Sequence, residues 1–251
     1  MIETIAIVNR RGGVGKTATA HALGTGLALR GYKTLFVDLD SQCNLSFDVG
    51  AKPAPLTSME VLSGTATAEE AIQHTYSGDI IPASPSLAVA DTTIDGTGKE
   101  YRLKEALEPV QGLYDYIIID TPPALGVLTV NALTACTSAI IPAQAEVHSI
   151  HGIGLLYEAI RAVKKYTNPA LTIKGILITR YNGRAVLSRD MRSNLEETAK
   201  ELGTKVFSTP IRECTAIKEA QATQTDIYGY APKSNATADY TALLDEIEKE
   251  R

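Results

Sequence analysis

Residues 4–17 have the sequence TIAIVNRRGGVGKT, and this stretch decides the fold. Its first part, TIAIVN, is a short apolar run of the kind that forms a buried strand, and a glycine-containing loop follows it. A strand, a glycine loop and a helix in this order predict a phosphate site, because the loop N–H groups and the helix dipole point at one place. The helix is predicted over residues 16–30 from apolar residues at helical spacing: Ala20, Leu23, Leu27 and Ala28.

Each position of the loop has a chemical role in nucleotide binding. Lys16 is expected to reach the β- and γ-phosphates, and the Thr17 hydroxyl to ligate Mg²⁺. The alternative, a glycine-rich turn without a ligand, leaves the coincidence of glycines, Lys-Thr, strand and helix unexplained. The residues expected to surround the nucleotide are Arg11, Gly12, Gly13, Val14, Gly15, Lys16, Thr17 and Ala18.

Two further apolar runs end in aspartates. Residues 33–40, KTLFVDLD, place Asp38 and Asp40 at alternate positions, and residues 114–123, YDYIIIDTPP, place Asp120 after four β-favouring residues. Open parallel sheets bind ligands at the carboxyl edge of their strands, so these side chains are expected near the phosphate loop. Asp120 is then expected to hold the hydration shell of Mg²⁺. A solvated carboxylate at a strand end is the alternative for Asp38 and Asp40.

Three segments resemble the motifs of one family in that family's order. The loop RRGGVGKT lacks the glycine of the ordinary P-loop, where this chain has Arg10, but resembles the KGGxGK[ST] loop of the ParA/MinD superfamily. The segment DLDSQCN resembles the family's DxDPQGN switch, with Ser41 and Cys43 replacing its proline and glycine. The stretch IIIDTPPALGVLTVNAL is very similar to its second switch. The chain thus resembles the ParA partition ATPases over nearly its whole length.

This resemblance implies a fold, a reaction and a set of site residues. The fold is a doubly wound α/β sheet of mostly parallel strands with helices on both faces, and the ligands are ATP and Mg²⁺. Arg11 occupies the position of the signature lysine, which enters the partner subunit's site in a nucleotide sandwich dimer. With Lys16 and with Asp40, which orients the attacking water, it forms the implied catalytic set. The implied metal-binding residues are Thr17, Asp38 and Asp120.

Positive charge gathers in the later part of the chain. Residues 161–218 carry 12 Lys and Arg against 5 Asp and Glu, a local balance of +7 in a chain whose net charge is −5. Within this window, Arg184, Arg189 and Arg192 lie where ParA relatives carry DNA-contacting basic residues. Binding to the DNA backbone needs only such cations over phosphates. The alternative is a surface helix of mixed charge. Further on, Pro210 and Arg212 are expected to contact the adenine.

The implied cycle is an ATP-bound homodimer that binds non-specific double-stranded DNA and is released after hydrolysis stimulated by a ParB-like centromere-binding protein. The expected location is cytoplasmic, and nucleoid-associated in the ATP state. Three alternatives remain open: a MinD-like positioning ATPase on membranes, a relative that phosphorylates or amidates metabolites, and a slowly hydrolysing nucleotide-binding scaffold. The C-terminal residues TALLDEIEKER are acidic, which disfavours the membrane alternative.

Composition suits one globular domain over residues 1–251, with 44% hydrophobic and 21% charged residues and no linker-like segment. The apolar runs are far shorter than the roughly 20 residues that cross a bilayer. Cys43, Cys136 and Cys214 lie far apart without metal-binding spacing, which favours reduced thiols.

Overall fold

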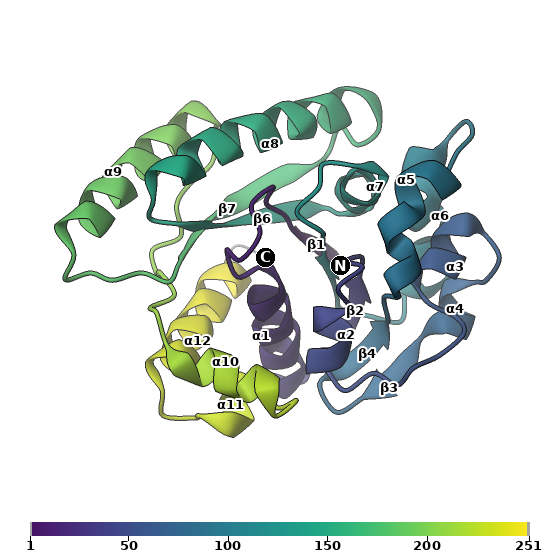
Figure 1. The fold of residues 1–251 in the computed structure, drawn as a ribbon, viewed down its shortest axis with the longest axis horizontal. Helices are drawn as coiled ribbons and strands as arrows, with labels where there is room; N and C mark the ends of the chain where they lie inside the picture. Colours follow the sequence, from purple (N-terminus) through teal and green to yellow (C-terminus); the bar gives the residue numbers. More distant parts are fainter. Residues whose placement is uncertain (1, 250–251) are drawn as a thin grey trace.

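The computed structural model describes residues 2–249, and within them seven strands form one sheet in the order β3-β4-β2-β5-β1-β6-β7 (Figure 1). Every neighbouring pair is parallel except β3 and β4, which form an antiparallel hairpin at one edge. The predicted mostly parallel sheet is therefore confirmed. The strands are β1 (Glu3–Ile7), β2 (Thr34–Asp38), β3 (Gln73–Thr75), β4 (Gly78–Ile81), β5 (Tyr116–Asp120), β6 (Ser138–Gln144) and β7 (Thr172–Thr179).

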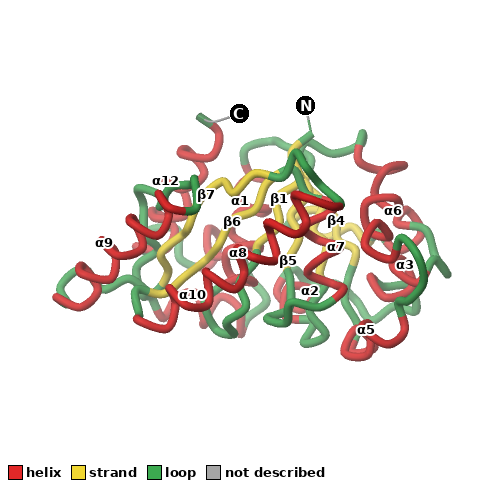
Figure 2. Tube along the Cα trace, turned by 90° about the horizontal axis from the view of Figure 1, so that it is seen from above, coloured by secondary structure: helices red, strands yellow, loops and turns green. Residues whose placement is uncertain are grey.

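Helices cover both faces of this sheet, as predicted. One face carries α6 to α9, and the other carries α1, α10, α11 and α12 (Figure 1), so that the strands lie inside the molecule (Figure 2). The longer helices are α1 (Lys16–Leu29), α6 (Arg102–Gln111), α7 (Val127–Ala135), α8 (Val147–Tyr166), α9 (Val186–Glu201), α10 (Thr215–Ala222) and α12 (Asn235–Glu248). The short ones are α2 (Asn44–Asp48), α3 (Ser58–Ser63), α4 (Ala68–Ala71), α5 (Ala90–Thr93), α11 (Ile227–Tyr230) and the 3₁₀ turns Pro85–Val89 and Lys99–Tyr101.

The strand register places the predicted acidic residues together. Asp38 of β2 lies beside Asp120 of β5, and Asp120 lies beside Ile7, the last residue of β1. β2 and β5 are buried along their whole length, which explains their continuous apolar sequence. The carboxyl ends of three adjacent strands therefore meet where the chain leaves β1 for the glycine loop.

The C-terminal helix α12 docks on α1. Its apolar stripe, Tyr240, Leu243, Leu244 and Ile247, is buried, as the sequence predicts. The approach is so close that a Cβ on Gly26 of α1 would lie 2.4 Å from the Leu244 Cδ1 atom. A side chain at this position would therefore force Leu244 and Tyr228 to move.

A segment outside the seven strands extends the edge of the sheet. Residues 205–212 follow the free edge of β7 through two isolated bridges, Ile176 to Val206 and Tyr181 to Arg212. The Ile211 N–H donates to the Ile178 carbonyl at 2.8 Å, so the segment is fixed just before it reaches the site. Among the described residues, no helix has the length and apolar character needed to cross a membrane. The three cysteines are free thiols.

Candidate functional site

The loop between β1 and α1 has the conformation that a phosphate needs. Gly13 and Gly15 adopt left-handed backbone angles, with φ of 73° and 87°, which favour glycine over any other residue. Gly15 is the N-cap of α1, and no side chain caps the helix. The first N–H groups of α1 are therefore available to an anion, which the helix dipole also favours.

Side chains from the neighbouring strands hold this loop in place. Gln144, the last residue of β6, donates to the Gly13 carbonyl at 3.0 Å, and Thr179, the last residue of β7, donates to the Val14 carbonyl at 2.8 Å. Asn9 accepts a bond of 2.9 Å from the Arg11 N–H. Sequence reasoning missed all three positions. The available signal was a polar residue at the end of an apolar strand, the same signal that marks Asp38 and Asp120.

Lys16 lies almost completely buried at the start of α1. Its Nζ atom donates to the Arg11 carbonyl at 3.2 Å, so the side chain folds back over the loop. Burial lowers the pKa of Lys16, while Asp120 and Asp40 act in the opposite direction. The ammonium group thus lies between the loop and the acidic strand ends.

Asp120 is fully buried, and only one of its two carboxylate oxygens has a hydrogen-bond partner. Its Oδ2 atom accepts a hydrogen bond of 2.7 Å from the Thr17 hydroxyl, whereas its Oδ1 atom is buried without a partner. Burial raises the pKa of Asp120 well above the usual value, and the negative charge of the nearby Asp38 raises it further. A buried carboxylate of this kind is costly unless a cation offsets it. The pair of Thr17 and Asp120 therefore fits the chemistry of a Mg²⁺ site.

The other two aspartates differ in their surroundings. Both carboxylate oxygens of Asp38 are engaged: Oδ1 accepts from the Asp40 N–H at 3.0 Å, and Oδ2 accepts from the Ser46 N–H and hydroxyl at 2.9 and 2.7 Å. Burial raises the pKa of Asp38 to about 6. Asp40 is half-buried, accepts from the Gln42 N–H, and lines the cavity described next. Asp38 thus fixes the backbone that carries Asp40.

Among the side chains that the structure describes, no three or more from His, Cys, Asp or Glu are grouped to hold a metal ion by themselves. Mg²⁺ keeps several waters and takes phosphate oxygens, so that a hydroxyl and one or two carboxylates are enough.

A cavity of about 390 Å³ lies over the loop. Its walls come from the loop and the start of α1, from the residues after β2, and from residues 211–221. Of the residues predicted to bind the nucleotide, Gly12, Gly13, Gly15, Lys16, Thr17, Ala18 and Arg212 line it. Arg11, Val14 and Pro210 are not among the lining residues; Val14 is fully buried, and next to Pro210 it is Ile211 that faces the cavity. Arg180, with a left-handed φ of 49°, was not predicted and also lines the cavity.

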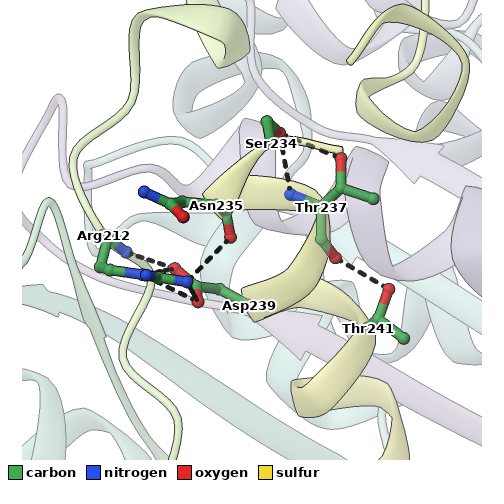
Figure 3. A network of polar contacts seen from close by, with 6 residues as sticks. All are labelled: Arg212, Ser234, Asn235, Thr237, Asp239 and Thr241. Atoms are coloured by element: carbon green, nitrogen blue, oxygen red, sulfur yellow. Dashed lines mark hydrogen bonds and ion pairs between the residues drawn. The ribbon is translucent and has the colours of Figure 1, made fainter. Parts of the chain in front are cut away.

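Arg212 is fixed by the C-terminal helix (Figure 3). Its guanidinium forms a bidentate ion pair with Asp239 of α12, with distances of 2.6 and 2.9 Å, and its backbone N–H also donates to Asp239 at 2.9 Å. Asp239 is 6% exposed. The arginine therefore anchors the 211–213 segment against α12, and the segment offers the cavity its backbone.

Comparisons with known proteins agree with this geometry. A family model described as an AAA domain matches residues 2–173. The chain is 38% identical to the sporulation initiation inhibitor protein Soj of Bacillus subtilis, with 98% of each chain covered. It is 36% identical to the chromosome partitioning protein ParA of Myxococcus xanthus, over 98% of this chain and 87% of that protein. The chain belongs to the ParA/Soj family of partition ATPases.

A solved structure extends the comparison to the ligands of this family. Cobyrinic acid a,c-diamide synthase from Mycobacterium smegmatis, with bound ADP and magnesium, superposes with a TM-score of 0.86 at 34% identity, covering 99% of this chain and 95% of that one. The ParA/Soj-family chain described here is accordingly an ATPase that uses ATP and Mg²⁺.

In this ParA/Soj-family protein the signature position carries an arginine that is engaged within its own subunit. The Arg11 Nη2 atom lies 2.7 Å from the Glu146 Oε2 atom, and the Arg11 Nη1 atom is buried without a partner. Glu146 immediately precedes α8. No sequence pattern pairs these residues, which lie 135 positions apart.

Of the three arginines predicted to contact DNA, Arg184 lies just before α9 and Arg189 and Arg192 lie in its first two turns. They differ in their exposure to solvent. Arg184 and Arg189 are exposed, and the Arg189 guanidinium donates to the Gly183 carbonyl at 3.1 Å. Arg192, one turn further, is half-buried and pairs with Glu196 at 2.9 Å. The first two therefore offer the more available positive charge.

Proposed function

We propose that this partition ATPase forms a sandwich dimer when it binds ATP with Mg²⁺, that the dimer binds DNA without sequence preference, and that hydrolysis stimulated by a ParB-like partner releases it. The observation that carries the proposal is the buried, half-satisfied Asp120 beside Thr17 and Lys16, at the mouth of a loop built for phosphate. Membership of the ParA/Soj family supports the partition role.

The chain's own residues divide the work of binding and hydrolysis. Lys16 exchanges its bond to the Arg11 carbonyl for the β- and γ-phosphates, which offer a full negative charge. Thr17 supplies a hydroxyl ligand to Mg²⁺, which neutralises charge on the phosphates when it is bound. The unpartnered Asp120 oxygen would hold the hydration shell of the ion, and the nearby Asp38 would add negative charge to the site.

Asp40 is the residue that we propose orients the attacking water. It lines the cavity, and its backbone N–H is fixed by Asp38, so its carboxylate is placed before the nucleotide arrives. Arg11 is proposed to stabilise the phosphates bound by the partner subunit, in the manner of an arginine finger. The arginine fork differs from the ammonium of the family's signature lysine, so turnover by an Arg11→Lys variant tests this role.

DNA binding is proposed for the start of α9. Arg184 and Arg189 are exposed there, and Arg192 adds charge that Glu196 partly offsets. Backbone binding of this kind is driven by counterion release, so its affinity falls steeply with salt.

The decisive experiment measures binding to random-sequence duplex DNA with ATP, with ADP and without nucleotide, at several salt concentrations. We expect binding with ATP only. Replacing Arg184 and Arg189 by alanine should lower the slope of log affinity against log salt by about 1.8, since each lost phosphate contact removes about 0.9. The exposed Lys104→Ala variant on α6 is the matched control and should leave the slope unchanged. Binding that is equal in all nucleotide states would refute the switch.

The membrane alternative is disfavoured by α12, because its apolar stripe is buried on α1 instead of facing outward. Co-sedimentation with anionic liposomes in the ATP state tests it directly. The scaffold alternative predicts a large gain in turnover for Arg11→Lys. A metabolite-modifying role, of the kind named for the Mycobacterium smegmatis structure, predicts that a small carboxylic acid substrate, and not DNA with a partner protein, stimulates turnover.

A further inference from the structure

Arg11, the residue at the signature position, is held inside its own subunit through both its backbone and its side chain. Its backbone N–H donates to Asn9, and its carbonyl accepts from Lys16. Its guanidinium is paired through Nη2 with Glu146 at 2.7 Å. Both side chains of the pair are partly open to solvent, with 36% of Arg11 and 47% of Glu146 exposed, so the pair can be broken without unfolding the loop.

The Glu146 carboxylate has no part in starting the helix it precedes. Glu146 is the N-cap of α8, and its side chain makes no capping hydrogen bond. Its ion pair is made with the phosphate loop instead. Among the residues that the structure describes, the only side-chain contact given to the Glu146 carboxylate is therefore the one with Arg11.

The guanidinium is also incompletely satisfied in this arrangement. Arg11 Nη1 is buried and has no partner, which costs free energy that a second acceptor would recover. A phosphate group offers several oxygens and a higher charge than a single carboxylate, and it suits the planar fork of arginine. Glu146 and a phosphate thus compete for the same group, and the phosphate supplies the better set of acceptors.

We infer that Glu146 is a positioning residue that keeps Arg11 on its own subunit until an ATP-bound partner offers phosphate oxygens, and that it thereby sets the protein concentration at which the ATP dimer forms. This inference rests on the proposed sandwich dimer. Binding of ATP favours release in a second way, because Lys16 leaves the Arg11 carbonyl for the phosphates and frees the backbone of the arginine.

The size of the effect follows from the exposure of the pair. An exposed ion pair shifts an equilibrium by up to about fivefold, and each dimer breaks two such pairs. Replacing Glu146 by the isosteric glutamine should therefore lower the midpoint concentration for ATP-dependent dimerisation by roughly 2- to 25-fold.

The test measures dimerisation by analytical ultracentrifugation with a non-hydrolysable ATP analogue and Mg²⁺. It compares the wild type, Glu146→Gln, Arg11→Ala and the double variant. The inference requires a lower midpoint for Glu146→Gln, no further change on adding that substitution to Arg11→Ala, and a kcat at saturating protein within about twofold of wild type. The matched control is Glu158→Gln, which removes a 3.2 Å pair with Arg161 on the same helix and should leave the midpoint unchanged.

Three results would overturn the inference. An unchanged midpoint for Glu146→Gln would leave the proposed dimer intact and remove the positioning role. An equal fall in the Arg11→Ala background would assign the effect to lost negative charge in general. A large fall in kcat would mean that Glu146 places Arg11 for catalysis. If no variant dimerises with ATP while all bind a fluorescent ADP analogue equally, the proposed function itself fails.

Discussion

A buried histidine on α1 should make stability depend on pH. His21 lies on α1 with 5% of its surface exposed, its ring meets the Phe36 ring edge-on at 6.4 Å, and its Nε2 atom lies 3.4 Å from the Ser77 hydroxyl. Burial lowers its pKa from 6.5 to about 4, although Asp226 acts in the opposite direction. The folded protein therefore resists protonation that the unfolded chain accepts.

The sign and size of the effect follow from linkage. Between pH 6.5 and pH 4 the unfolded state binds more protons at this position than the folded state does, so stability falls as the pH falls. With these two pKa values, the free energy of unfolding drops by roughly 2 kcal/mol between pH 7 and pH 5 through His21 alone, and by about 3.4 kcal/mol in full.

Buried carboxyl groups have the opposite effect on stability. The contribution of His21 must therefore be isolated by comparing the wild type with a His21 variant. Burial raises the pKa of Asp48 and of Asp38 to about 6, and such groups gain stability as the pH falls through 6. Urea unfolding of the wild type and of His21→Gln at pH 7 and pH 5 removes their contribution by subtraction. We expect the wild type to lose roughly 2 kcal/mol more than the variant over this interval, whatever the packing cost of glutamine at pH 7. Equal losses in the two proteins would refute the assignment.

Three further substitutions test the site. Asp120→Asn should abolish Mg²⁺-dependent phosphate release yet raise the free energy of unfolding without nucleotide by about 1–2 kcal/mol, because it removes a buried charge; a less stable variant would contradict this. Gln221→Ala should cost about 1–3 kcal/mol at pH 7, since it removes the 2.7 Å bond to the Asp48 carboxylate, and urea unfolding should show a smaller cost below pH 6. Asp239→Asn should raise the KM for ATP several-fold by loosening Arg212, with kcat within about twofold; a fall in kcat at constant KM would argue against an anchoring role.

The sequence was sufficient to predict those parts of the site whose chemistry depends on local order. A glycine loop after a strand and before a helix places Lys16 and Thr17 by backbone geometry alone. Asp38 and Asp120 follow apolar runs, and parallel strands bring such ends to one edge. In each case the local sequence identifies the residue and indicates which edge of the sheet it lies at, so these positions could be predicted without the tertiary structure.

Contacts between distant elements could not be predicted in this way. Arg212 was expected at the adenine, but its partner Asp239 lies on a helix 27 positions later, and only the docking of α12 on α1 brings them together. Glu146 was equally hidden, because its pairing with Arg11 depends on β6 lying next to β1 in the sheet order. An ion pair leaves no periodic signal, so neither partner marks the other.

The two hidden pairs have a common consequence for how the site works. Each holds an arginine through a carboxylate that belongs to a different element: Asp239 fixes Arg212 and the 211–213 segment, and Glu146 holds the Arg11 side chain. They differ in the burial of the carboxylate, since the Asp239 side chain is 8% exposed and the Glu146 side chain 47%. A buried carboxylate is costly to leave without its partner, and an exposed one is not. The segment held by Asp239 should therefore stay rigid through the ATP cycle, while the Arg11 side chain is the part of the site free to exchange partners.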